Sequence, residues 1–400
     1  FEIQDCYFSA PSTTGTAAVE FWYVTNGKVS NCISDASRGG EGFLIAGSSN
    51  NVFINNTVVD NAKGFDIIQS SHSNTLIENT VTSSGGGYSL SGSDNSKLIG
   101  NIAADNPGSG FRLTECFNTT VVNNTSTGNT LFGFSLRDCT NNTISNNTCA
   151  SNGYSGFSMS HSSNHNTLTE NSAISNSANG FFIYGESSYN TFTSNIIAFN
   201  SDEGIDLSSS TSSNNTFFLN VFYDNGGANA RDDGANNTWD DGASSGNYWD
   251  DYGGDGSYVI SGGAGSQDRY PFEIVRPTID TPDDLSYTEG TTGHSITWNP
   301  VATFPSSYRV LKNDTIVDSG VWNGSEIVIE VDGLPPGLHK YKLIVEDGFG
   351  NTANDIVFVS VVADSEGGPS IPREMVTLGV GIGAAAVVIL LSYALYTKGR

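Results

Sequence analysis

The sequence predicts a mainly β protein whose larger part is a right-handed parallel β-helix, and three observations support this. A Gly-Phe-x-Leu-like motif recurs every 22 to 24 residues between residues 42 and 207. Asparagine recurs in two columns at the same interval, and the segment is rich in Gly, Asn, Ser and Thr. A fixed period of this length is typical of stacked repeats. The glycines that begin the motif are Gly42, Gly64, Gly87, Gly110, Gly133, Gly156, Gly180 and Gly204.

Each repeat holds three short apolar segments separated by polar corners. The first is the Gly-Phe-x-Leu motif, whose Phe and Leu share one face of a strand because they are two residues apart. The other two follow asparagines, as in residues 142–144 and 147–149. Hairpin signals such as Asn-Gly are largely absent, so these strands are not expected to pair as hairpins. We therefore expect each repeat to form one coil of three strands that pairs in parallel with the next coil.

Two asparagine columns are expected at the corners between strands. Stacked coils place equivalent residues about 4.8 Å apart, so the side-chain amides can hydrogen-bond along a column. Asparagine also tolerates the left-handed backbone that tight corners need. The columns are Asn56, Asn79, Asn101, Asn124, Asn147, Asn171, Asn195 and Asn220, and then Asn61, Ser84, Asn106, Asn129, Asn152, Asn176, Asn200 and Asn225.

The chain is strongly acidic, with a net charge of −26 and only 16 basic residues among 400. Nucleic acid binds to broad basic surfaces, so we exclude it as a partner. The acidity suits a solvated surface, cation binding or a saline exterior.

The composition changes several times along the chain, which indicates several domains. Short alternating strands after residue 275 predict an immunoglobulin-like or fibronectin III-like β-sandwich. The expected boundaries are 1–223 for the β-helix, 224–275 for its acidic Gly/Asp-rich terminal cap, 276–363 for the sandwich, 364–374 for a linker, 375–396 for a transmembrane helix and 397–400 for a cytoplasmic tail.

Residues 375–396 carry no charged side chain and are numerous enough to cross a bilayer. Lys398 and Arg400 follow them, so the positive-inside rule places the C-terminus in the cytoplasm and the preceding domains outside. We expect a single-pass cell-membrane protein whose span has the lipid bilayer as its partner. An export signal is expected before Phe1.

Two pairs of cysteines occupy equivalent positions on neighbouring coils. Cys116 and Cys139 are one repeat apart, and Cys6 and Cys32 are matched in the same way. A Cα separation of about 4.8 Å lies within the range of a disulfide. Two interpretations remain open, namely disulfides in an exported protein and reduced cysteines that replace serine.

Aspartates of the acidic segment are candidate calcium ligands. Asp- and Gly-rich loops supply the oxygen ligands that calcium prefers. The alternative is that the segment only caps the last coil with its aromatic side chains. No predicted role requires a cofactor, and calcium is the one cofactor to test. The candidate ligands are Asp240, Asp241, Asp250, Asp251 and Asp255.

One outward column carries candidate catalytic residues. Glu115, Asp138 and His161 are expected on three consecutive coils, about 5 Å apart. A glycosidase needs two carboxylates at about 5 to 9.5 Å, and Arg112 and Arg137 nearby are candidate ligand-binding residues. The alternative is three exposed corner residues with no shared role.

The repeat resembles the parallel β-helix repeat shared by carbohydrate-binding proteins and sugar hydrolases, and it is most similar to NosD-type proteins, described as periplasmic copper-binding. Residues 246–252, 254–260 and 267–272 resemble that family's β-helix end motif. Residues 337–362 resemble the last strands of immunoglobulin-like modules, and the layout resembles archaeal cell-surface proteins with a C-terminal anchor. Copper sites need clusters of Met, His or Cys. We expect none, because Met159 stands alone and the histidines share no column.

We expect a cell-surface protein that acts as a binding, adhesion or envelope scaffold module, with glycans or other surface proteins as partners. One alternative is a polysaccharide hydrolase or lyase on the β-helix wall. Another is a structural surface-layer protein. Asn313 and Asn323 lie in sequons outside the repeats and are the expected glycosylation sites.

Overall fold

The computed structural model describes residues 1–9, 17–35 and 39–364. The chain divides into two compact units, Phe1–Glu273 and Ile274–Arg400. Within the described residues both units are built from β-strands, and none of these residues lies in a helix.

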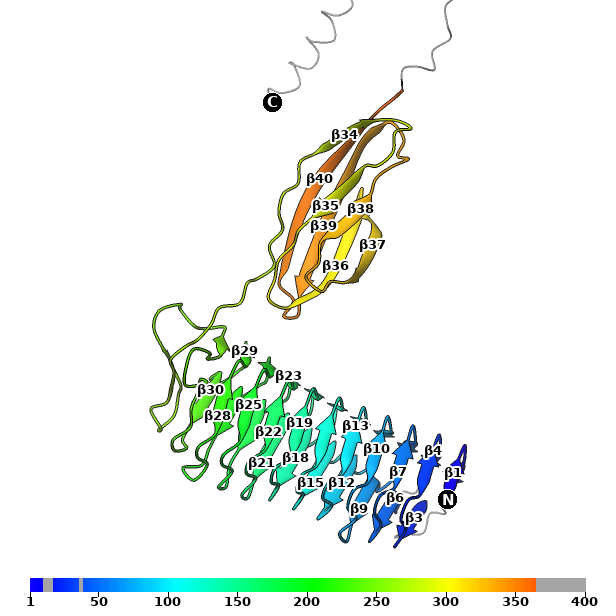
Figure 1. Ribbon diagram of the computed structural model, residues 1–400, viewed down its shortest axis with the longest axis vertical. Helices are drawn as coiled ribbons and strands as arrows, with labels where there is room; N and C mark the ends of the chain where they lie inside the picture. Colours follow the sequence, from blue (N-terminus) through cyan, green and yellow to red (C-terminus); the bar gives the residue numbers. More distant parts are fainter. Residues whose placement is uncertain (10–16, 36–38, 365–400) are drawn as a thin grey trace, which may run out of the picture. The chain divides into compact units, whose positions relative to one another are not determined.

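The first unit is a solenoid of three parallel sheets, A, B and C, in which each coil gives one strand to each sheet (Figure 1). The predicted parallel β-helix is therefore confirmed. Sheet A holds β1 (Glu2–Gln4), β4 (Lys28–Ser30), β7 (Val52–Ile54), β10 (Thr75–Ile77), β13 (Lys97–Ile99), β16 (Thr120–Val122), β19 (Thr143–Ser145), β22 (Thr167–Thr169), β25 (Thr191–Thr193) and β28 (Thr216–Phe218).

The other two sheets complete each coil. Sheet B holds β2 (Tyr7–Ser9), β5 (Ile33–Asp35), β8 (Thr57–Val59), β11 (Thr80–Thr82), β14 (Ile102–Ala104), β17 (Thr125–Thr127), β20 (Thr148–Ala150), β23 (Ser172–Ile174), β26 (Ile196–Ala198), β29 (Val221–Tyr223) and β31 (Tyr248–Trp249). Sheet C holds β3 (Val19–Trp22), β6 (Glu41–Ala46), β9 (Lys63–Ile68), β12 (Tyr88–Ser91), β15 (Phe111–Thr114), β18 (Phe134–Arg137), β21 (Phe157–Ser160), β24 (Phe181–Ile183), β27 (Ile205–Leu207) and β30 (Ala230–Asp232).

The aromatic residue of each Gly-Phe-x-Leu motif points into the solenoid. The rings of Phe111 and Phe134 stack with centroids 4.4 Å apart, and the column is fully buried. The preceding glycine is required by close packing. A Cβ on Gly64 would lie 2.5 Å from the Gly87 carbonyl oxygen and from the Val81 methyl groups. The motif thus combines an aromatic core with a backbone that a neighbouring strand approaches closely.

Both predicted asparagine columns form hydrogen-bonded ladders. The Asn147 side-chain nitrogen donates to Asn171 Oδ1 at 3.0 Å, and the Asn152 side-chain nitrogen donates to Asn176 Oδ1 at the same distance. A third ladder, which the sequence did not predict as one, passes through Asn142, Asn166, Asn190 and Asn215. All three ladders run in one direction, because each amide donates toward the C-terminal end.

Each ladder ends on a carboxylate at the C-terminal end of the solenoid, within residues 232–268. Asn237 donates to Asp232, and the Asn247 backbone donates to Asp268 Oδ2 at 2.6 Å. The ladder through Asn152 and Asn176 passes from Asn225 to Asn229, which donates to Asp250 and Asp251. The last amide of a ladder has a donor without a further coil to receive it, and these carboxylates supply the acceptor.

Aromatic rings cover the last coil in the same segment. Trp239 stacks on Phe217, and Trp249 stacks on Phe222, each with ring centroids 4.2 Å apart. Both indoles are buried, and each indole N–H donates to a ladder-ending carboxylate. A small antiparallel pair, β32 (Tyr258–Val259) and β33 (Gln267–Asp268), completes this cap.

The second unit holds a five-stranded and a two-stranded sheet whose side chains share one hydrophobic cluster. The immunoglobulin-like assignment stays a prediction. The expected transmembrane helix at 375–396 lies outside the described residues, and no described helix could span a membrane. The strands are β34 (Leu285–Thr288), β35 (Ser295–Trp298), β36 (Pro305–Lys312), β37 (Thr315–Val321), β38 (Ile327–Glu330), β39 (Gly337–Asp347) and β40 (Thr352–Val362).

Candidate functional site

The outer face of sheet C carries side chains that change from coil to coil. The variable position of each Gly-Phe-x-Leu motif points outward, because the flanking Phe and Leu point inward. In-register pairing stacks these positions in one column along the axis. The column reads Asp66, Ser89, Arg112, Ser135, Ser158, Phe182, Asp206 and Arg231.

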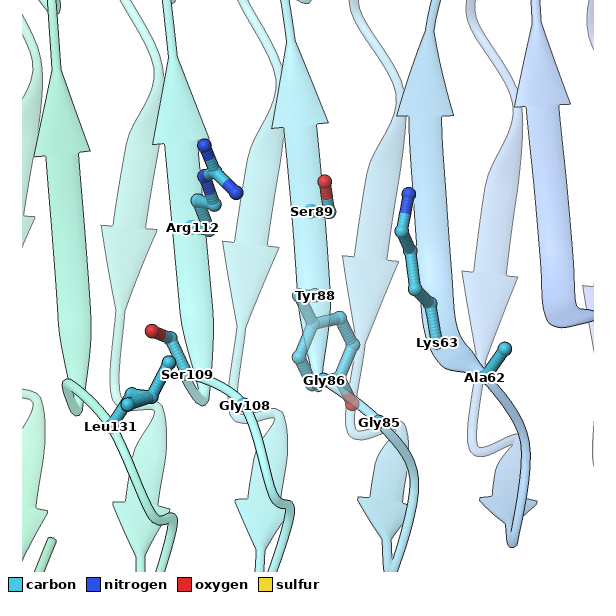
Figure 2. Close-up of a pocket in the computed structure, with 11 residues that line it drawn as sticks. Ala62, Lys63, Gly85, Gly86, Tyr88, Ser89, Gly108, Ser109, Arg112 and Leu131 are labelled. Carbon is cyan, nitrogen blue, oxygen red and sulfur yellow. The ribbon is translucent and has the colours of Figure 1, made fainter. Parts of the chain in front are cut away.

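A pocket of about 230 Å³ opens over β9, β12 and β15 on this face. Figure 2 shows Lys63 and Arg112 on either side of Ser89, with glycines along one edge. The glycines leave the space open because they carry no side chain, and a Cβ on Gly85 or Gly108 would collide with backbone of the preceding coil. The hollow is therefore a result of coil packing.

The pocket brings together two cationic side chains in an acidic protein. Lys63 Nζ lies 2.6 Å from Asp66 Oδ2, so its charge is balanced by a carboxylate that is nearly buried. Arg112 is exposed, and no acidic group in the described part of the chain forms an ion pair with it. Its five N–H donors are therefore available to an oxygen-rich anion.

The edge of the pocket is apolar. Leu131 lines it and is exposed. On the next coil, the Tyr154 backbone donates to the Leu131 carbonyl oxygen, and the Tyr154 ring meets Phe132 edge-to-face at 5.0 Å. The pocket thus offers hydroxyl and guanidinium groups beside an apolar rim.

The structure stacks the three predicted catalytic residues at one corner, just after the strands of sheet C. The Glu115 backbone donates to the Arg137 carbonyl, and the Asp138 backbone donates to the Ser160 carbonyl. Asp138 and His161 line an open hollow of about 340 Å³ together with Glu186, whereas Glu115 does not line it. Arg137 Nε lies 3.4 Å from Asp138 Oδ2. A catalytic role for these residues stays a prediction.

The structure does not group the five predicted calcium ligands into a metal site. Asp240 is held by the Arg269 guanidinium, which keeps the pKa of that carboxyl below its usual range. Asp241 accepts three backbone amides, which lower its pKa to about 2. Asp250 and Asp251 end an asparagine ladder, and Asp255 is exposed. Internal donors thus bind several of these oxygens, and calcium binding stays a prediction.

The paired cysteines lie where the repeat predicts, but as free thiols. The Cys116 and Cys139 side chains are close enough to share a hydrogen bond, and so are those of Cys6 and Cys32. Neither pair is joined by a disulfide in the structure, and a disulfide in the exported protein stays a prediction. The predicted glycosylation sites Asn313 and Asn323 are exposed in the second unit.

Sequence reasoning selected Arg112 but missed Lys63, Ser89 and Asp206. The available signal was the variable position of the motif, which becomes an outward column once the repeats are aligned. Burial raises the pKa of Asp206 to about 6, with Glu203 adding to the shift. Its Oδ1 is buried without a hydrogen-bond partner among the described residues.

Comparisons with known proteins identify the family. A family model described as periplasmic copper-binding protein (NosD) matches residues 3–130 and 108–254. No curated protein sequence matches the chain. A mutant of the periplasmic alginate epimerase AlgG is similar in structure, with 16% identity over 56% of this chain and 59% of that chain and a TM-score of 0.46. This chain therefore spans less than two thirds of that protein. The A-module of the Azotobacter vinelandii mannuronan C-5 epimerase AlgE6 is 13% identical over 68% of this chain and 85% of that module, with a TM-score of 0.44.

The family description names copper, and the histidines that the structure describes are not grouped with one another or with Met159 as copper ligands. Met159 is fully buried in the core, and His161 and His165 lie in different columns. His72 accepts a hydrogen bond from the Asp94 backbone in a third column. Across residues 1–9, 17–35 and 39–364, no three His, Cys, Asp or Glu side chains come together to hold a metal.

The two matched segments overlap and together cover residues 3–254, which is more than half of the chain and spans the solenoid with most of its cap. The protein therefore belongs to the NosD family.

Proposed function

We propose that this protein is a glycan-binding surface protein that holds carboxylate-bearing sugars in the pocket formed by Lys63, Ser89 and Arg112. The observation that carries the proposal is the exposed Arg112 guanidinium, which forms no ion pair with the described residues, beside a glycine-edged pocket in a chain whose net charge is −26. An exposed cation that no described carboxylate pairs with, in so acidic a protein, favours an external anion.

The chemistry of the pocket favours a uronate over a simple anion. A guanidinium binds a carboxylate through two parallel hydrogen bonds. Ser89 adds a hydroxyl that can bond to sugar hydroxyls, and Leu131 offers an apolar surface to the C–H groups of a sugar ring. Lys63 adds a second donor, positioned by its ion pair with Asp66.

Calorimetric titration of the full chain with uronic-acid oligosaccharides tests the proposal. Arg112→Gln removes the positive charge and the paired N–H donors of the guanidinium group. We expect about tenfold weaker binding, which is a loss of about 1.4 kcal/mol in binding free energy. Arg309→Gln removes the same charge from an exposed site in the second unit and serves as the control. Equal affinity for neutral and uronate oligosaccharides would contradict the proposal.

The hollow at Asp138, His161 and Glu186 favours a second candidate, a polysaccharide-cleaving enzyme, because three groups able to transfer protons line one depression. Asp138→Asn and Glu186→Gln would abolish release of reducing ends from polysaccharide if this candidate is correct. Binding without any such release supports the glycan-binding proposal.

A further inference from the structure

The outward column continues beyond the pocket as a track of small residues that ends at aromatic rings. Ser135 follows Arg112, and Ser158 follows Ser135, each in register on the next strand of sheet C. Phe182 follows Ser158 in the same column. From β15 to β24 there are three strand spacings, or about 14 Å.

One serine of this track, Ser158, is covered although it faces outward, and so is Ser160 two residues further along β21. Ser158 is 1% exposed and Ser160 is 4% exposed. The in-register neighbour of Ser158 is Phe182, and that of Ser160 is Arg137. We infer that these two large side chains extend over the serines, close to the surface of the sheet. The Phe182 ring contacts the Tyr184 ring at 4.8 Å with a tilt of 30°. Both rings are half-buried, so they form a ledge with part of its surface open to solvent.

Charge changes sign immediately beyond this ledge. Asp206 is the in-register neighbour of Phe182, and Asp202 and Glu203 precede it. On the next strand, Arg231 is held by Asp233 at 2.7 Å. Four carboxyl groups against one paired guanidinium repel an anionic polymer. On the side of the pocket, by contrast, Arg112 and Arg137 stand on adjacent strands.

We propose that an anionic oligosaccharide lies along the solenoid axis, from the Lys63–Arg112 pocket to a sugar ring packed on the Phe182–Tyr184 ledge, and that the acidic coils beyond limit its length. This inference rests on the proposed function and adds the direction and extent of the ligand. Aromatic faces carry partial negative charge and pack against the C–H face of a sugar. The footprint from β9 to β24 covers five strand spacings, or about 24 Å.

A length series of uronic-acid oligosaccharides, from disaccharide to dodecasaccharide, tests the inference by calorimetry on the full chain. We expect affinity to rise with length until the ligand spans about 24 Å and then to stay constant. Phe182→Ala should weaken binding of the long oligosaccharides about three- to tenfold and leave the short ones unchanged. Arg112→Gln should weaken both. Asp206→Asn should strengthen binding of the longest oligosaccharides only.

Matched variants separate a lost ligand contact from a folding defect. Phe182→Tyr keeps the ring and should bind as the unaltered chain does, and Phe117→Ala removes an exposed ring elsewhere. Short oligosaccharides that bind through Arg112 without any gain from greater length would overturn the inference and leave the proposed function intact. Absence of uronate binding at every length would instead overturn the proposed function itself.

Discussion

Asp206 and Arg231 face each other in register on β27 and β30, yet Arg231 forms its ion pair with Asp233. Asp206 keeps one oxygen that is buried without a hydrogen-bond partner in the described residues. Burial, and then the nearby Glu203 carboxylate, raise its pKa to about 6. The ionised form of Asp206 therefore costs the folded protein stability, and Arg231 only partly offsets this cost.

This arrangement predicts a pH dependence of stability. A carboxyl whose pKa is raised on folding binds its proton more tightly in the native state, so its destabilising effect is full above pH 6 and disappears as the pH falls toward 3.8. Asp206→Asn should raise the free energy of unfolding at pH 7 by about 1–3 kcal/mol. Denaturant unfolding at pH 7 and pH 4.5 measures this, and a gain of equal size at both pH values would contradict the assignment.

Two glycines of neighbouring coils should respond differently to alanine. A Cβ on Gly64 would collide with the Gly87 carbonyl oxygen, whereas a Cβ on Gly86 would meet only the Ser109 oxygen at 3.8 Å. We expect Gly64→Ala to destabilise the solenoid by about 2 kcal/mol or more. Gly86→Ala, the matched control, should be neutral or slightly stabilising. Thermal unfolding of both variants checks the difference, and similar melting temperatures would contradict the described strand packing.

The buried ladders should be sensitive to loss of one amide. Asn147 donates to the Val121 carbonyl and to Asn171, and it accepts from Asn124. Asn147→Ala leaves these buried groups unsatisfied, so we expect a loss of about 2–4 kcal/mol in the free energy of unfolding. Thr143→Ala alters an exposed residue of β19 and should change it by less than about 0.5 kcal/mol. A ladder variant as stable as this control would show that the amides contribute little.

The cap should depend on Trp249. Its ring stacks between Phe222 and Tyr258, and its N–H donates to Asp268 Oδ2 at 2.9 Å. Trp249→Ala should cost about 3–5 kcal/mol through the cavity it leaves. Trp249→Phe keeps an aromatic ring and should cost less, mainly through the lost hydrogen bond. Hydrogen exchange of the last coils would reveal whether local unfolding of the solenoid begins at the cap. Trp22 is exposed, and Trp22→Ala serves as the control.

The sequence predicted the inside of the solenoid better than its outside. The Phe column and both asparagine ladders follow from a fixed period, because each inward side chain repeats its environment on every coil. The pocket depends on outward residues that do not repeat, such as Ser89 and Arg112, and on the space left by glycines. Its shape follows from coil-to-coil packing, which the period alone does not give.

The acidic cap shows a different limit of sequence reasoning. Asp250 and Asp251 have the composition of a calcium loop, and in the structure they accept hydrogen bonds from Asn229. The donors come from segments more than 20 residues away in sequence, and their direction was not visible in the pattern. Whether a carboxylate binds a cation or ends an amide ladder depends on which groups the fold brings to it.

The uniform direction of the three amide ladders gives the solenoid two chemically different ends. At the C-terminal end every ladder presents hydrogen-bond donors, so an additional coil can attach there only by displacing Asp232, Asp268 and the Asp250–Asp251 pair. An asparagine accepts from one coil and donates to the next, whereas an aspartate oxygen at the end of a ladder only accepts. The change from an amide to a carboxylate, two nearly isosteric groups, thus marks the C-terminal end of every ladder.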